Sequence, residues 1–169
     1  MSARSTNSSA TLTDEQSAAR ELVRSWAAGS RAVEAARDVE QGDPDDWHAM
    51  IHLNVLAVLT TAHATLPHLR KTKGHFVVTG SKAGRDHMKG SVYGATKWFV
   101  QGLAGNLAEE MREWGGRCTV ISPGMVDTPF FDEPKPDKIQ PDDVANAVVF
   151  ALSQPRSADV REIHIMPGG

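Results

Sequence analysis

Three short apolar runs, separated by stretches with helical periodicity, constrain the fold of this chain more than any other feature. The runs are HFVVTG (75–80), RCTVIS (117–122) and EIHIM (162–166). Apolar runs of this length, bounded by glycine or proline, are typical of strands that are buried on both faces. Strands that alternate with helices at this spacing indicate right-handed crossovers and a parallel sheet covered by helices. The sequence therefore predicts an α/β fold.

The stretches between these runs carry helix start and stop signals. The first helix is predicted to begin after Asp43, a good N-cap, and to end between Lys71 and Gly74. The second contains Tyr93 and stops at the glycine pair 115–116, and the third begins at Pro141. The first helix also carries a broad apolar face, made of Trp47, Met50, Ile51, Val55, Val58, Leu59, Ala62 and Leu66.

The composition fits one ordinary domain and excludes several classes of protein. A chain of 169 residues with a net charge of −3 gives no sign of nucleic acid or of a membrane surface as a partner. No apolar run approaches the roughly 20 residues of a membrane span, and the first residues lack the apolar segment of a signal peptide. Cys118 is the single cysteine and cannot form an internal disulfide, which suits a reducing compartment. We therefore expect a cytoplasmic protein.

The chain divides into three parts by composition. Residues 1–13 are rich in serine and threonine and are expected to be disordered. Residues 14–37 are rich in alanine and predict one or two short helices. Residues 38–169 contain all the strand and helix signals of the α/β domain.

Tyr93 is the single tyrosine of the chain, and Lys97 follows it by one helical turn. Residues at i and i+4 share a helix face, so the phenol and the ammonium group can act on one point. A nearby cation favours phenolate and lowers the pKa of a tyrosine, which makes the phenol usable in proton transfer. The spacing alone still favours an amphipathic helix with a packed tyrosine and a solvated lysine.

Three further motifs occur with this pair in a specific order. Asn54 lies in HLNVLAV on the first helix, and Ser81 follows a strand in VVTGSKAG. The loop PGMVDTPF follows the next strand and contains Pro123, Gly124, Val126 and Thr128. With these motifs the chain, from about residue 38 to its end, resembles the catalytic half of the short-chain dehydrogenase/reductase family. The resemblance implies a partial Rossmann-like, doubly wound parallel sheet with flanking helices.

The resemblance also implies a role for each residue. Tyr93 would be the general acid or base, and Lys97 would lower its pKa and hold the nicotinamide ribose. Ser81 would donate a hydrogen bond to the substrate oxygen, and Asn54 would anchor a water that relays protons towards Lys97. The loop 123–128 would contact the nicotinamide amide and phosphate. Taken singly, Ser81 could equally end a strand, and Asn54 could equally bond a neighbouring backbone group.

A metal site is not expected. His48 and His52 are spaced i, i+4 on the first helix, but no third ligand recurs at metal-binding spacing. Two such histidines are more often part of a solvated helix face.

The glycine-rich loop that binds pyrophosphate in this family is missing from the sequence. Such a loop lets backbone N–H groups approach the phosphates at a helix N-terminus. TGSKAGRD (79–86) supplies Gly80 and Gly84, but Asp86 stands where the last glycine is needed and Tyr93 follows too soon for a crossover helix. The resemblance thus implies a member truncated at its N-terminus, which lacks the first βαβ nucleotide-binding unit. It implies NADP or NAD as cofactor, with weak or absent binding.

Two functions remain open on the sequence. One is an oxidoreductase for a small-molecule carbonyl or alcohol substrate, resembling NADP-dependent hydroxy-acid and alcohol dehydrogenases in its last segment (141–167). The other is a relative without redox chemistry that performs cofactor-independent proton transfer or acts as a binding or scaffold partner. In either case we expect a homodimer or larger, because a strand edge and the apolar helix faces need cover. Residues 14–37 or a second chain would supply it.

Overall fold

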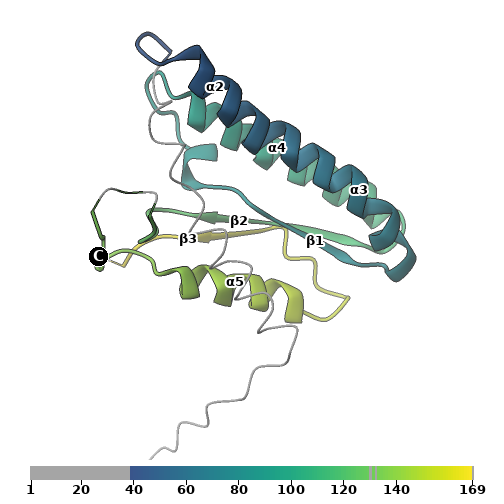
Figure 1. Cartoon of the computed structure of the whole chain (residues 1–169). Coiled ribbons are helices and arrows are strands. Elements are labelled where there is room, and N and C mark those ends of the chain that lie inside the picture. Colours follow the sequence, from purple (N-terminus) through teal and green to yellow (C-terminus); the bar gives the residue numbers. More distant parts are fainter. Residues whose placement is uncertain (1–38, 130, 132, 169) are drawn as a thin grey trace, which may run out of the picture.

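The computed structural model describes residues 39–129, 131 and 133–168. The expectations for residues 1–13 and 14–37 lie outside these ranges. The described chain forms three layers, with a parallel sheet between two layers of helices (Figure 1). Helices α2, α3 and α4 lie on one face of the sheet, and α5 lies on the other. The predicted α/β class is confirmed.

The sheet has three strands in the order β1-β2-β3, and all neighbours are parallel. β1 spans His75–Thr79, β2 spans Arg117–Pro123 and β3 spans Glu162–Ile165, so each predicted run is a strand. β2 is the central strand and is buried from its second residue onward, as expected for a strand covered on both faces. Within the described residues, β1 pairs with β2 on one edge only.

The helices begin and end close to the predicted positions. They are α2 (Pro44–Ile51), the π-helical segment η2 (His52–Leu56), α3 (Ala57–Thr72), the 3₁₀ turn η3 (Lys82–Gly84), α4 (Val92–Arg112) and α5 (Pro141–Ser153). The Asp43 carboxylate accepts a hydrogen bond from the Asp45 N–H at 2.9 Å and caps α2 as predicted. The π-helical turn that joins α2 to α3 was not predicted from the sequence.

Two of the three apolar clusters in the described core lie on opposite sides of the sheet, and the third is a small one around Met50. The cluster between the sheet and α3–α4 has at its centre Phe76, Val100, Ala104, Leu107, Met111 and Val120. The cluster between the sheet and α5 contains Ile121, Val126, Ile139, Val144 and Ala145. Both clusters rest on β2, whose side chains point alternately to the two faces.

The apolar face of the first helix is less buried than its pattern suggests. Met50 and Ala62 are buried, but Ile51 and Leu59 are 42% and 39% exposed. The continuous helix Pro44–Thr72 is the one helix of the described residues that is long and apolar enough to cross a membrane, by length and composition alone. The apolar stripe is wider than one neighbouring helix can cover, so part of it faces outward.

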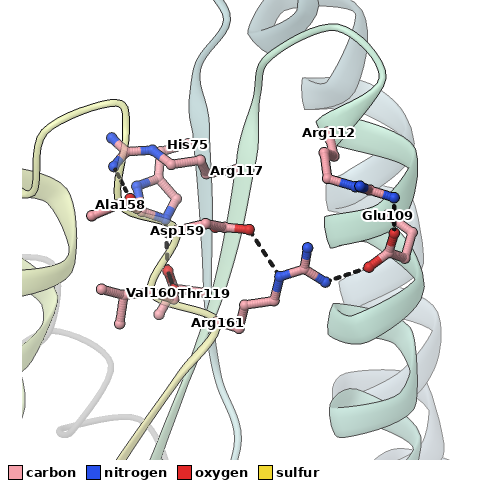
Figure 2. A network of polar contacts seen from close by, with 9 residues as sticks. All are labelled: His75, Glu109, Arg112, Arg117, Thr119, Ala158, Asp159, Val160 and Arg161. Carbon is pink, nitrogen blue, oxygen red and sulfur yellow. Dashed lines mark hydrogen bonds and ion pairs between the residues drawn. The ribbon is translucent and has the colours of Figure 1, made fainter.

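At the N-terminal end of the sheet, a polar network ties the segment before β3 to β1 and β2 (Figure 2). The Arg117 guanidinium donates to the carbonyls of Gln154 and Ala158, each at 3.1 Å. Nε2 of His75 lies 2.7 Å from the Thr119 hydroxyl, which donates to the carbonyl of Val160. Most of these bonds end on backbone carbonyls, so the network fixes the course of the chain.

Candidate active site

All the residues singled out by the sequence motifs line one cavity. It has a volume of about 750 Å³ and opens at the C-terminal ends of β1 and β2. Ligands of parallel α/β sheets bind at this end of the strands. The motif residues in its lining are Asn54, Ser81, Tyr93, Lys97, Pro123, Gly124, Val126 and Thr128.

Tyr93 and Lys97 lie in the first turns of α4. The Ser91 hydroxyl caps this helix by accepting from the Gly94 N–H at 2.9 Å. One turn on, the Lys97 ammonium lies 5.7 Å from the centroid of the Tyr93 ring and donates to the carbonyl of Thr79 at 3.4 Å. The solvated lysine that spacing alone favoured is therefore wrong, because Lys97 is only 7% exposed.

Burial changes the acidity of both groups. Burial lowers the pKa of Lys97 to about 8, since the charged ammonium loses its water. Burial raises the pKa of Tyr93, and a hydrogen bond with Ser81 only partly opposes this. The expectation that the lysine would bring the tyrosine pKa below its ordinary value is therefore wrong in direction. Desolvation of the phenol outweighs the hydrogen bond with Ser81.

Ser81 opens the 3₁₀ turn η3 and lies between β1 and α4. Its hydroxyl accepts from the Ala83 N–H at 3.1 Å. Gly84 closes the turn against α4, where a Cβ atom would lie 2.6 Å from the Lys97 carbonyl oxygen. A glycine is needed for this close approach. The serine loop is thus packed directly onto the helix that carries the tyrosine and the lysine.

Asn54 occupies the middle of the π-helical turn η2 and is buried. Its side-chain amide donates to the Thr96 hydroxyl at 3.0 Å, and that hydroxyl donates to the Tyr93 carbonyl at 2.8 Å. π-helical turns inside α-helices occur frequently at functional sites. Thr96 was missed by the sequence reasoning, and it joins Asn54 to the turn of α4 that holds Tyr93.

The Pro-Gly loop forms the wall opposite α4. The Gly124 N–H donates to the Ile165 carbonyl at 2.8 Å, which holds the loop against the end of β3. Val126 is buried and forms an isolated parallel bridge with Ile139. Thr128 lies farther along the same wall of the cavity. The loop is therefore anchored on both sides of the positions that the resemblance assigns to nicotinamide contact.

The cavity extends beyond the motif residues along β1, at the edge that pairs with no other described strand. Phe76, Val77 and Val78 line it there, together with Ala57 and Thr61 of α3. Met88, Met125 and Phe131 add apolar lining. This extension of the cavity could not be predicted from the sequence, because it depends on the distance between a strand edge and a helix.

Lys97 and the loop 123–128, which the resemblance assigns to the nicotinamide end of a dinucleotide, line the same cavity. Among the described residues, two glycine-containing segments follow a strand at the cavity: the serine loop, which is packed against α4, and the Pro-Gly loop, where Gly124 lies against Met166 and Pro167. In the same part of the chain, no group of three or more His, Cys, Asp or Glu side chains could hold a metal ion.

Comparison with known proteins gives matches in sequence and in structure. A family model described as short chain dehydrogenase matches residues 26–139. An uncharacterised oxidoreductase of Staphylococcus aureus (strain USA300) is 39% identical over 128 residues, which are 73% of this chain and 55% of the relative. The chain thus spans about half the length of this curated relative.

Solved structures match the fold over most of the chain. The serine dehydrogenase of Escherichia coli superposes with a TM-score of 0.69 and 29% identity, over 78% of this chain and 58% of that one. The alcohol dehydrogenase of the archaeon Thermococcus sibiricus, complexed with 5-hydroxy-NADP, superposes with a TM-score of 0.72 and 25% identity. The match covers 90% of this chain and 70% of that one.

The family match begins inside the segment that the sequence analysis left outside the family pattern. Its first residue is Trp26, whereas the pattern was expected to begin at about residue 38. Residues 26–37 therefore fall within the family match. This stretch contains a single glycine, Gly29, and so does not show the glycine-rich loop of the family.

Proposed function

This chain belongs to the short-chain dehydrogenase family, and from that premise we propose that it interconverts a small carbonyl compound and the corresponding alcohol with a nicotinamide cofactor. The observation that carries the proposal is the convergence of eight motif residues from α4, η2 and two loops on one cavity. Each motif alone is weak evidence for a function. The chemistry is supported because the motif residues lie together at the C-terminal end of a parallel sheet.

Tyr93 is the proposed proton donor in carbonyl reduction and the acceptor in alcohol oxidation. Negative charge develops on the substrate oxygen as the carbonyl carbon is reduced, and a phenol within reach supplies the proton. Ser81, which lines the same cavity, donates a hydrogen bond to that oxygen and stabilises the developing charge. Because burial raises the pKa of Tyr93, the phenol stays protonated and ready to donate at neutral pH.

Lys97 stabilises the phenolate that remains after proton transfer. Its pKa of about 8 keeps the ammonium mostly charged at neutral pH, and it lies 5.7 Å from the Tyr93 ring centroid. Asn54 holds Thr96, and through it the Tyr93 carbonyl, so it orients the first turn of α4. The proposed water relay from Asn54 to Lys97 remains part of the same proposal.

A nicotinamide cofactor, when bound, supplies or accepts the hydride. Lys97, Pro123, Gly124, Val126 and Thr128 are the residues proposed to hold its nicotinamide end. The alcohol dehydrogenase that superposes on this chain is complexed with an NADP derivative, which supports a nicotinamide cofactor, NADP or NAD. We propose that the affinity is weak, because no described residue offers a pyrophosphate-binding glycine loop.

The test is a spectrophotometric assay of the purified chain with NADPH and a panel of small aldehydes, ketones and keto acids. NADPH consumption that depends on the carbonyl compound, and that Tyr93→Phe abolishes, would support the proposal. Titration of NADPH fluorescence gives the affinity independently of turnover. A low-micromolar dissociation constant would contradict the proposed weak binding.

The alternative function is proton transfer without a cofactor, or service as a binding partner. It is favoured by one observation: the cavity holds an intact set of acid–base groups, while the described chain offers no site for the pyrophosphate. If NADPH is neither bound nor consumed, exchange of α-hydrogens of a ketone for deuterium measures proton transfer alone. Exchange that needs the Tyr93 hydroxyl would then establish this second function.

We also propose that the chain forms a homodimer or a larger assembly. The outward faces of α2, η2, α3 and α4 expose Ile51, Leu53, Leu56, Leu59 and Trp98, of which Leu53 is 52% and Leu56 is 50% exposed. An exposed apolar surface on a helix pair is typical of an interface. Light scattering should give at least twice the monomer mass, and Leu56→Glu should lower it. A soluble monomer in the unchanged chain would refute the proposal.

A further inference from the structure

Behind the cavity lies a polar cluster that the proposed chemistry does not use. Its members are Arg85 just after η3, Gln101 on α4, Ser122 near the end of β2 and Glu162 at the start of β3. Gln101 and Ser122 are buried, and the Glu162 side chain is 26% exposed. Four segments that are distant in the sequence therefore meet at one carboxylate.

The inner half of the cluster is a closed set of hydrogen bonds. The amide nitrogen of Gln101 donates to the Ser122 hydroxyl at 2.6 Å and to Oε1 of Glu162 at 2.9 Å. The Ser122 hydroxyl donates to the same carboxylate oxygen at 3.0 Å. An ionised carboxylate can only accept, so Gln101 must turn its amide nitrogen towards it. The carboxylate thus fixes the orientation of both buried partners.

The outer half of the cluster is an ion pair. Nε of Arg85 donates to Oε1 of Glu162 at 3.2 Å, and its terminal nitrogen pairs with the second carboxylate oxygen. Two-point pairing of this kind fixes geometry as well as charge. Arg85 follows Ser81 by four residues, so the ion pair ties the serine loop to β3.

The backbone of the serine loop rests on this cluster and on the lysine. A Cβ atom on Gly80 would lie 3.1 Å from the Ser122 hydroxyl oxygen, and one on Gly84 would lie 3.1 Å from Cγ of Gln101. Gly84 also touches the Lys97 carbonyl, and Gln101 follows Lys97 by one turn of α4. A shift of the cluster must therefore move the loop relative to Tyr93 and Lys97, because no space separates them.

We propose that Glu162 is a positioning residue for the active site. Its carboxylate holds the serine loop, α4 and the end of β2 at the spacing that Ser81, Tyr93 and Lys97 need in order to act together. This inference rests on the proposed function, because positioning matters only if Ser81, Tyr93 and Lys97 act together. Its test uses the ionisation of Tyr93, which can be followed whether or not the chain turns over a substrate.

The single tyrosine makes this test specific. Chain grown with 3-fluorotyrosine carries one fluorine label, at position 93, and fluorine brings the phenol titration into a milder pH range. ¹⁹F NMR against pH then reports Tyr93 alone. In Glu162→Gln the serine loop is expected to loosen, water enters around the phenol, and the titration midpoint moves down towards that of free fluorotyrosine. Loss of desolvation lowers this midpoint because burial is the larger cause of its elevation.

The matched control is Glu109→Gln on the same helix. Glu109 of α4 is exposed and pairs with Arg112 and Arg161 (Figure 2), and none of the three lines the cavity. Glu109→Gln also removes an ion-paired carboxylate. If Glu162 only stabilised the fold, both substitutions would affect the Tyr93 titration alike. We expect the midpoint of Glu109→Gln to equal that of the unchanged chain. A folded Glu162→Gln with an unshifted or raised midpoint would overturn the proposal.

A second variant keeps the test decisive if Glu162→Gln does not fold. Arg85→Gln removes only the outer ion pair and leaves the bonds of Gln101 and Ser122 to the carboxylate. We expect a smaller downward shift in this variant, since half of the loop attachment remains. An unchanged midpoint in Arg85→Gln would mean that the ion pair does not hold the serine loop, and the proposal would fall.

Discussion

The two ends of the sheet both bury polar side chains, but they use them differently. At the N-terminal end, His75 is bonded to Thr119, and both Thr119 and Arg117 donate to backbone carbonyls before β3 (Figure 2). At the C-terminal end, Tyr93 and Lys97 line a cavity of about 750 Å³. The hydrogen bonds of the first set end on other groups of the chain, whereas the second set lines a cavity in which it can contact a ligand.

The comparison shows that a shifted pKa does not by itself mark an active site. Burial lowers the pKa of His75 to about 4 and that of Lys97 to about 8, and both shifts have the same physical cause. Structural networks and functional sites both perturb acidity. What separates the two ends is the cavity and the convergence of several proton-transfer groups on it. Each substitution below changes side chains at one end of the sheet and leaves those at the other end unchanged.

The largest expected effect is the loss of activity in Tyr93→Phe. Removing the phenol hydroxyl takes away the general acid, which contributes about 10²–10⁴-fold to rate in enzymes of this kind. The assay is carbonyl-dependent NADPH consumption, with circular dichroism to show that the fold is kept. The matched control is Thr119→Val, which removes one hydroxyl from the opposite end and should lower stability while keeping the rate. An active Tyr93→Phe chain would end the hypothesis of a catalytic phenol.

The next effect is a gain of stability at the active-site end in Lys97→Met. At pH 7 the buried ammonium is charged at a cost, which methionine removes, so the free energy of unfolding should rise by on the order of 1–3 kcal/mol. The unfolded lysine binds its proton up to about pH 10.5, and the folded one only up to about pH 8. Stability of the unchanged chain should therefore rise between these values, and Lys97→Met should lack this rise.

Urea titrations at pH 7 and pH 9.5 measure both effects. Lys71→Met is the control, because Lys71 is exposed on α3. Activity should be lost in Lys97→Met and kept in Lys71→Met. A Lys97→Met chain that is less stable at pH 7 would show that the ammonium contributes more through its contacts than it costs by burial.

The helices and strands, and most of the residues of the candidate site, could be predicted from the sequence. Strand lengths, the Asp43 cap and the order of the motifs are local features, and local periodicity and capping determine them. The features it missed depend on contacts across long sequence distances. Gln101 and Glu162 are 61 residues apart, and Arg85 and Glu162 are 77 apart. The raised pKa of Tyr93 was missed for the same reason, because burial depends on the packed loops around the ring.

A moderate effect is expected at the N-terminal end of the sheet in Arg117→Met. Its guanidinium donates to three backbone carbonyls, those of Gln154, Pro155 and Ala158. Leaving partly buried carbonyls without a donor costs about 1–3 kcal/mol. Thermal unfolding should show the loss, whereas the rate of NADPH consumption should be unchanged. Arg112→Met is the control, because Arg112 is exposed and its bond is to Glu109. An equal loss in both variants would contradict the structural role of Arg117.

The smallest expected effect is a pH dependence of stability that His75 creates. Its folded-state pKa of about 4 lies below the ordinary 6.5, because burial and then the Arg117 charge disfavour the protonated ring, while Asp159 opposes them. Between these values the unfolded chain binds a proton that the folded chain excludes, so stability falls as the pH is lowered from 6.5 towards 4. One proton gives at most about 1.4 kcal/mol per pH unit, and the half-buried ring should give less. In His75→Gln this contribution to the pH dependence of the unfolding free energy should disappear, while the contribution of the carboxylates remains. The unfolding free energy of each chain is measured in urea at several pH values. The difference between the two resulting pH curves isolates the imidazole ring. Parallel curves from pH 7 to pH 4.5 would show that His75 takes up its proton as readily in the folded chain as in the unfolded one.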